Sequence, residues 1–223
     1  MQRLKQTALL AFITCIAAIP QKSYAQSTPL PAGAISAHVL GRVQILPDFS
    51  VKVYGYFTFV TGAPSSIFNG APSENTAVLT FAADPTAATL ISNGGVIQGL
   101  ENPVNGSFTA MSLYYNSNPA GRNILNPDDF TQGQKVATFR SRAAVVNITS
   151  SGNFQGTSGL ALDTADTFVV NGQPLNIGSL ISALNLTVFG PAPTLDSVAA
   201  SLLTDGSVSI PFSGTAYVAP PLN

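Results

Sequence analysis

Apolar and polar side chains alternate along several stretches of the chain, and this pattern predicts β-strands. Val43 and Ile45, and then Val51 and Val53, recur at every second residue, so one face of each strand is expected to be buried. The stretch 51–60 is also dense in β-branched and aromatic residues, which suit a half-buried pleated surface. The expected strands are Ile35–Leu46, Val51–Val60, Thr76–Ala83, Ser107–Tyr115, Val136–Thr149, Phe154–Leu162, Thr167–Val170, Leu184–Phe189 and Ser207–Val218.

Turn-forming dipeptides lie between many of these strands. Asn-Gly occurs at 69–70, 93–94, 105–106 and 171–172, and Asp-Gly occurs at 205–206. Both pairs tolerate the positive φ of a type I′ turn, whose twist matches that of two paired antiparallel strands. We therefore expect tight turns or hairpins at the last two of these positions.

Three short segments are expected to be helical. Asp84-Pro85 supplies a cap followed by proline at the first helical position, whereas Ile177–Leu184 and Thr194–Leu203 have apolar residues at helical spacing. A few short helices among many strands are typical of an all-β domain. The sequence therefore predicts an all-β fold, an antiparallel β-sandwich or jelly-roll-like domain with two or three short helices.

One short sequence occurs twice in the second half of the chain. Phe154-Gln-Gly-Thr157 and Phe212-Ser-Gly-Thr215 are each followed by a stretch of small residues. The two segments are either equivalent strands in two parts of the sheet or a coincidence of composition.

The first 25 residues have the pattern of a secretory signal peptide. A short start with two basic residues precedes a nearly unbroken apolar run at Thr7–Ile19, and Ser23 and Ala25 supply the small residues of a cleavage site. The run is shorter than the roughly 20 residues needed to span a bilayer. We expect cleavage near Ala25 and a protein that is secreted, periplasmic or at the cell surface. A bacterial source suits the short signal best.

The remainder of the chain is expected to form one domain. Residues 26–34 are rich in proline and glycine and are interpreted as a flexible leader. No polar linker divides residues 35–219, which are expected to be a single all-β domain, and residues 220–223 form a short tail. The single cysteine, Cys15, lies in the signal peptide, so the mature chain is expected to be cysteine-free.

Charged residues make up only 9% of the chain, against roughly 25% in an ordinary soluble domain. Beyond the signal peptide, six basic and ten acidic residues leave a net charge of −4. So few lysines and arginines argue against a nucleic-acid partner, which requires a basic surface. We also expect no transmembrane segment in the mature chain, because no later stretch is long and apolar enough.

The residue types that most catalytic sites need are scarce. His38 is the only histidine and is expected on a strand, and neither a nucleophile elbow nor a set of zinc ligands occurs. Glu74 and Glu101 are the only glutamates, and they leave a carboxylate-dependent hydrolase as an alternative. We expect no cofactor and no metal, although oxygen-rich segments at 123–129 and 163–166 leave calcium open.

Two pairs of residues are candidates for ligand binding. Tyr114 and Tyr115 precede a loop rich in Asn, Ser, Pro and Gly at 116–121, where aromatic rings can hold sugars by stacking, or they pack in the core. Arg140 and Arg142 are two residues apart and would share one face of a regular strand. They would receive an anionic group there, or form a solvated face that discourages strand pairing.

These features favour a secreted or cell-surface β-protein without catalytic activity and with a structural or adhesive role. Such a protein would self-associate through exposed strand edges or bind a surface glycan. An extracellular carbohydrate- or small-ligand-binding module is the first alternative. A carboxylate-dependent hydrolase is the second.

Overall fold

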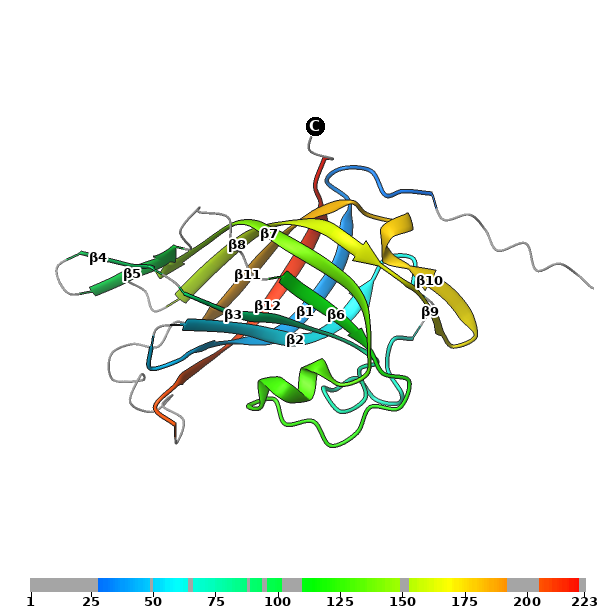
Figure 1. Cartoon of the computed structure of the whole chain (residues 1–223), viewed down its shortest axis with the longest axis horizontal. Helices are drawn as coiled ribbons and strands as arrows, with labels where there is room; N and C mark the ends of the chain where they lie inside the picture. The colour runs from blue at the N-terminus through cyan, green and yellow to red at the C-terminus, as the bar shows by residue number, and fades with distance from the viewer. Residues whose placement is uncertain are drawn as a thin grey trace, which may run out of the picture.

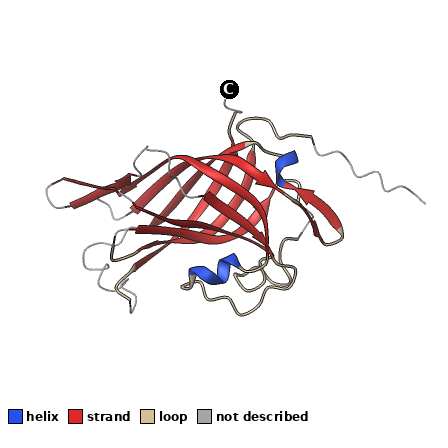
Figure 2. Ribbon diagram, in the orientation of Figure 1, coloured by secondary structure: helices blue, strands red, loops and turns tan. Residues whose placement is uncertain are grey.

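The computed structural model describes residues 28–48, 50–63, 66–87, 89–93, 96–101, 110–148, 153–191 and 205–220 (Figure 1). Strands dominate this part of the chain, and the all-β prediction is confirmed (Figure 2). The strands are β1 (Ile35–Ile45), β2 (Ser50–Val60), β3 (Leu79–Ala87), β4 (Thr89–Asn93), β5 (Val96–Glu101), β6 (Ala110–Tyr115), β7 (Gln134–Ile148), β8 (Asn153–Ala165), β9 (Thr167–Val170), β10 (Gln173–Asn176), β11 (Ala183–Pro191) and β12 (Val208–Val218). Two short 3₁₀ helices are η1 (Pro127–Thr131) and η2 (Ile177–Ser179).

The prediction of a β-sandwich or jelly roll is wrong, because the main sheet closes into an eight-stranded antiparallel barrel (Figure 1). The strand order around the ring is β1-β2-β3-β6-β7-β8-β11-β12, and β12 pairs with β1. The β4–β5 hairpin extends the sheet beyond the ring by pairing with β7, whereas β9 and β10 form a separate hairpin. The alternation of apolar residues is the same in a sandwich and a barrel, so the pattern alone does not distinguish them.

Glycines on the inner face bring neighbouring strands close enough to curl around the core. Gly41 of β1 lies opposite Phe212 of β12, and a Cβ on Gly41 would lie 2.7 Å from Phe212 Cζ. Gly190 of β11 lies opposite Phe154 of β8, and a Cβ on Gly190 would collide with Cε1 of that ring. Each ring therefore fills the space that the opposite glycine leaves. The two Phe-x-Gly-Thr segments thus occupy equivalent positions, two strands apart in the ring.

Apolar side chains fill the interior of the barrel. The ring centroids of Phe57 and Phe81 are 5.5 Å apart, and those of Phe81 and Phe212 are 6.4 Å apart. A cavity of only ≈ 20 Å³ remains in the middle of the core, where no polar side chain lines it to hold a water. This inner cavity is too small for a ligand, whereas larger hollows lie on the outside of the barrel.

The two expected helices that fall on described residues are replaced by strands and a short 3₁₀ turn. Asp84 and Pro85 lie in β3, where the register with β2 shifts, and proline is tolerated in such irregularities. Only Ile177–Ser179 of the second segment is helical, and Ala183 already begins β11. The apolar residues at helical spacing serve a short turn and the strand after it, both of which are buried. Thr194–Leu203 lies outside the described residues.

The hairpin expected at residues 171–172 is confirmed. Asn171 and Gly172 connect β9 to β10 with φ angles of +49° and +78°, as a type I′ turn requires. This hairpin adds Phe168 to the core, where its ring centroid is 5.1 Å from that of Tyr115. Leu30, in the leader, donates its amide to the Leu180 carbonyl at 2.9 Å.

The long connection between β6 and β7 covers the outside of β2 and β3. Phe130 in η1 is fully buried against Tyr54, with ring centroids 5.3 Å apart, and its carbonyl accepts a hydrogen bond from Thr80 Oγ1 at 2.8 Å. Arg122 is buried too, and its Nη1 donates to the Glu74 carbonyl at 2.9 Å and to the Ala77 carbonyl. This part of the outer surface is therefore occupied by the chain itself.

Among the described residues, no helix has both the length and the apolar character needed to cross a membrane.

Candidate binding surface on the outside of the barrel

Exposed large hydrophobic side chains gather on one part of the outer surface. In the described part of the chain seven such residues are exposed, and five of them lie on the adjacent strands β2, β1, β12 and β11. We refer to these five as the aromatic face: Ile35, Leu40, Phe59, Phe189 and Tyr217. Leu125 and Val169 lie elsewhere. A concentration of exposed apolar residues on one surface indicates an interaction site more than single ones scattered over the molecule do.

The register of the strands places Phe189 at the centre of a row of outward side chains. Phe189 of β11 lies opposite Ser213 of β12 on one side and opposite Gln155 of β8 on the other. Ser213 in turn lies opposite Leu40 of β1. The Phe189 side chain is 54% exposed, so its ring is available to a partner and is flanked by a hydroxyl and an amide.

The next row along the strands is polar. His38, Thr215, Thr187 and Thr157 lie opposite one another on β1, β12, β11 and β8, and we refer to them as the polar row. Because neighbouring strands are roughly 4.8 Å apart, the hydroxyl groups recur at regular steps. The Nδ1 atom of His38 is 3.1 Å from Thr215 Oγ1, and its ring centroid is 5.6 Å from that of Phe59. His38 is therefore a strand histidine, as the sequence predicts.

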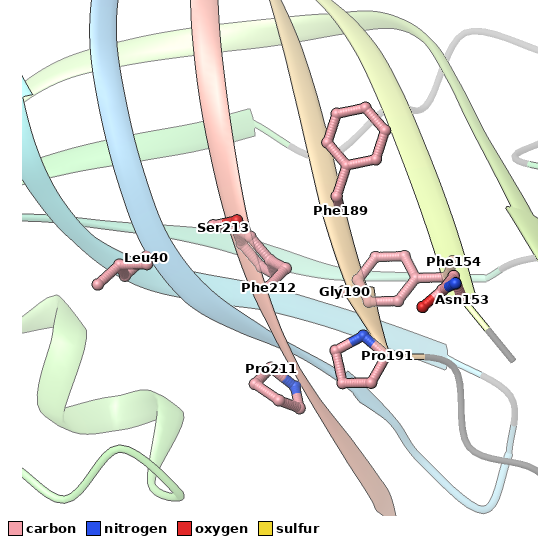
Figure 3. Close-up of a pocket in the computed structure, with 9 residues that line it drawn as sticks. All are labelled: Leu40, Asn153, Phe154, Phe189, Gly190, Pro191, Pro211, Phe212 and Ser213. Carbon is pink, nitrogen blue, oxygen red and sulfur yellow. The ribbon is translucent and has the colours of Figure 1, made fainter.

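Two open hollows meet at Phe189. The larger hollow, of ≈ 680 Å³, is drawn in Figure 3, and the smaller one, of ≈ 290 Å³, adjoins the polar row. Leu40, Phe189 and Ser213 line both. The larger hollow spans β1, β12, β11 and β8, and it is bordered by Asn153, Pro191 and Pro211 in addition to the three shared residues.

The surroundings of the larger hollow are nearly uncharged. No ionisable side chain in the described part of the chain lines it, and His38 is the titratable residue that lines the smaller hollow. Arg42 lies opposite Pro211 and is the cation beside this surface. Its Nε donates to Ser209 Oγ at 2.6 Å and its Nη2 donates to the Ser209 carbonyl at 2.9 Å. Partial burial lowers the pKa of Arg42.

A group of buried polar atoms lies next to Arg42 and is closed to solvent. Tyr54 is opposite Arg42 across β1–β2 and is fully buried. Its hydroxyl makes no hydrogen bond of good geometry within the described structure, although Ser209 is near enough to influence its pKa. Burial raises the pKa of Tyr54, and Ser209 and Arg42 offset only part of this effect. The Tyr54 ring packs against Phe130 of η1, which covers this side of the barrel.

The two candidate tyrosines do not form one platform. Tyr115 packs against the core beside Phe168, whereas Tyr114 lies half-buried with Lys135 Nζ 5.8 Å from its ring centroid. Adjacent residues of a strand point to opposite faces, so one of each such pair is directed inward. The loop beyond them is held by the chain, because Asn69 Nδ2 donates to the Ser117 carbonyl at 2.6 Å.

The two candidate arginines also lie in different surroundings. Arg140 Nη2 lies 2.9 Å from Asp163 Oδ1, in an ion pair between two exposed side chains. Arg142 is exposed and falls where the register between β7 and β8 shifts, between Ser141 and Ala143. This irregularity interrupts the alternation that would place both guanidinium groups on one regular face.

The described carboxylates considered for hydrolysis or calcium binding lie in turns, loops, η1 and β8. Glu74 lies in the turn before β3, and the side chain of Glu101 lies outside the described residues. In segment 123–129, Asp129 accepts hydrogen bonds from the Asn123 amide at 2.7 Å and from Asn126 Nδ2 at 3.0 Å. No group of three or more His, Cys, Asp and Glu residues that could hold a metal occurs in the described part of the chain.

Residues of the aromatic face were not among the sequence candidates, although one signal for them exists. Leu184, Leu186 and Val188 are buried at alternate positions of β11, so Phe189 falls at an outward position. A large aromatic side chain at an outward position is the unusual feature, and it is recognisable once the phase of the strand is known.

Comparison with protein-family models, with curated proteins and with solved structures finds no match to this chain.

Proposed function

We propose that this chain is a secreted, non-catalytic binding protein with an adhesive role, and that it attaches to its partner through the aromatic face. The observation that carries the proposal is that five of the seven large hydrophobic residues exposed in the described part of the chain lie on four adjacent strands. Secretion rests on the signal-peptide pattern of the first 25 residues.

Because the ring is closed, we place the proposed adhesive surface on outward side chains rather than on strand edges. Each of the eight ring strands pairs with a neighbour on both sides over at least part of its length, so fewer of its backbone groups are available to another chain. In the described sheet, β4 is the strand at the outer edge, with β5 as its one neighbour. Attachment through side chains of the aromatic face is therefore better supported than attachment through unpaired strands.

A double variant tests whether the aromatic face is the surface of attachment. Phe59→Ser together with Phe189→Ser removes two exposed rings, and Leu125→Ser together with Val169→Ser removes the two exposed hydrophobic residues outside the face. Retention of the full secreted chain is measured on surfaces coated with neutral polysaccharides, acidic polysaccharides or extracellular proteins. We expect the first variant to lose at least about tenfold in retention, because a few aromatic residues dominate most interfaces.

The control variant is expected to bind like the unaltered chain. Circular dichroism and the thermal midpoint establish that both variants remain folded. Equal retention of the two variants, or no retention of the unaltered chain on any of the surfaces, would contradict the proposal.

A further inference from the structure

We infer that the partner of the aromatic face is a neutral carbohydrate chain, stacked on Phe189 and hydrogen-bonded by the hydroxyl and amide groups on the neighbouring strands. This inference rests on the proposed function and names its ligand class. Four features support it: an exposed aromatic ring, hydrogen-bonding groups beside that ring, little charge and an open shape.

Phe189 supplies the stacking surface. Its side chain is 54% exposed in the wall shared by the two hollows, where a flat ring can cover the C–H face of a sugar. Pro191 and Pro211 border the same hollow with rigid apolar rings. These three side chains provide apolar contact at little cost in conformational entropy, because proline is fixed and phenylalanine has only two side-chain torsions.

Hydrogen-bonding groups lie on both sides of that ring. Ser213 and Gln155 are the register partners of Phe189 on the two neighbouring strands. The polar row follows one step along the strands, with hydroxyl groups on β12, β11 and β8. Sugars present an apolar ring face and a rim of hydroxyl groups, so a flat ring flanked by rows of donors and acceptors matches both parts.

The ligand is expected to be neutral because this surface offers little charge. No ionisable side chain among the described residues lines the larger hollow. Arg42, the cation beside it, is engaged by the side chain and the carbonyl of Ser209. An acidic ligand would lose its hydration here and would find, beside the hollow in the described structure, only Arg42, two of whose nitrogens already donate to Ser209.

The shape favours an oligosaccharide over a single sugar and over a second copy of this chain. The larger hollow is open and extends across four strands, so it can follow several units of a chain (Figure 3). Between two barrels the polar row would be buried through the middle of the contact, with Leu40 and Phe189 on one side, Tyr217 on the other and Phe59 at its end. Stable interfaces between identical subunits have a more continuous apolar centre.

Titration with soluble hexasaccharides tests the ligand class. The full secreted chain is titrated calorimetrically with cellohexaose, maltohexaose and mannohexaose, and with hexagalacturonate as the acidic comparator, at low and high salt. We expect at least one neutral hexamer to bind with an affinity that salt does not change, and hexagalacturonate not to bind. Phe189→Ser is expected to weaken binding at least about tenfold, whereas Phe189→Tyr and the matched exposed variant Val169→Ser retain it.

Three results would overturn the inference. The first is attachment to protein-coated surfaces that depends on the aromatic face while none of the neutral hexamers binds, and in that case the proposed function still stands. The second is a dimer in analytical ultracentrifugation that Phe189→Ser dissociates. The third is sugar binding that Phe189→Ser leaves unchanged. If attachment itself is insensitive to Phe59 and Phe189, the proposed function fails instead.

Discussion

Tyr54 is a residue at which burial governs chemistry as well as packing. Its ring lies against Phe130, and its hydroxyl is removed from water without a hydrogen bond of good geometry. Because the neutral phenol tolerates burial better than the phenolate does, the pKa of Tyr54 is raised above its ordinary value. The folded state therefore holds this proton more tightly than the unfolded state does.

This shift predicts a loss of stability in strong alkali. The contribution of Tyr54 is complete below the unfolded pKa of about 10 and is lost as the pH rises through the higher folded pKa. Urea unfolding at pH 8 and pH 11 measures the change in the free energy of unfolding. We expect the free energy of unfolding to fall less for Tyr54→Phe than for the unaltered chain. For Tyr217→Phe, at an exposed position, we expect the same fall as for the unaltered chain. A fall that is identical for all three chains would contradict this assignment.

At the scale of the strand, inward glycines set how closely neighbours approach. A Cβ on Gly41 would collide with the Tyr54 carbonyl oxygen as well as with the Phe212 ring. We expect Gly41→Ala to lower the free energy of unfolding by about 1–3 kcal/mol, since the backbone of β2 has to move. Urea unfolding followed by circular dichroism measures this difference.

Gly159 offers a matched control on β8, because a Cβ there would meet Asn185 Oδ1 at an ordinary distance of 3.6 Å. Gly159→Ala is expected to stay within about 0.5 kcal/mol of the unaltered chain. Equal effects at the two glycines would mean that close approach does not determine the curvature of β1 and β2.

The loops that cover β2 and β3 depend on Arg122. Its Nη1 serves the carbonyl groups of Glu74 and Ala77, although Nε and Nη2 find no partner among the described residues. Arg122→Met is expected to lower stability by about 1–3 kcal/mol, because two carbonyl groups lose their donor. Hydrogen exchange should also become faster in segments 66–78 and 116–133. The exposed variant Arg142→Met is expected to change neither quantity, and a stabilised Arg122→Met would contradict the role given to the guanidinium.

Elements whose signal is local were predictable from the sequence, and elements that depend on distant contacts were not. β1, β2 and β9 follow the alternation closely, and the Asn171-Gly172 turn follows from its backbone requirement. The segment at 177–184 has helical spacing, yet its apolar residues are used by a 3₁₀ turn and by β11. That choice is made by tertiary burial, which overrides local propensity.

At the scale of the whole molecule, closure of the ring could not be derived from the pattern of single strands. The pairing of β1 with β12 joins residues that are far apart in the sequence, such as Ile35 and Tyr217. Local sequence does not encode that contact. Glycines inside the strands, such as Gly41 and Gly190, were the available indication of strong curvature. The candidate site was missed for the same reason, because its row of side chains exists only after β1, β12, β11 and β8 are assembled.

The seam between β1 and β12 has a mechanical consequence. Gly33 donates its amide to the Val218 carbonyl at 2.9 Å, and Val218 donates its amide to the Ala34 carbonyl at 2.8 Å, so both strands leave the seam at the same end. A force that pulls the start of β1 away from the end of β12 would act along the inter-strand hydrogen bonds. It would therefore break them one after another. The row through Leu40, Ser213 and Phe189 crosses this seam, so such tension would separate Leu40 from Ser213 and disrupt the proposed binding surface.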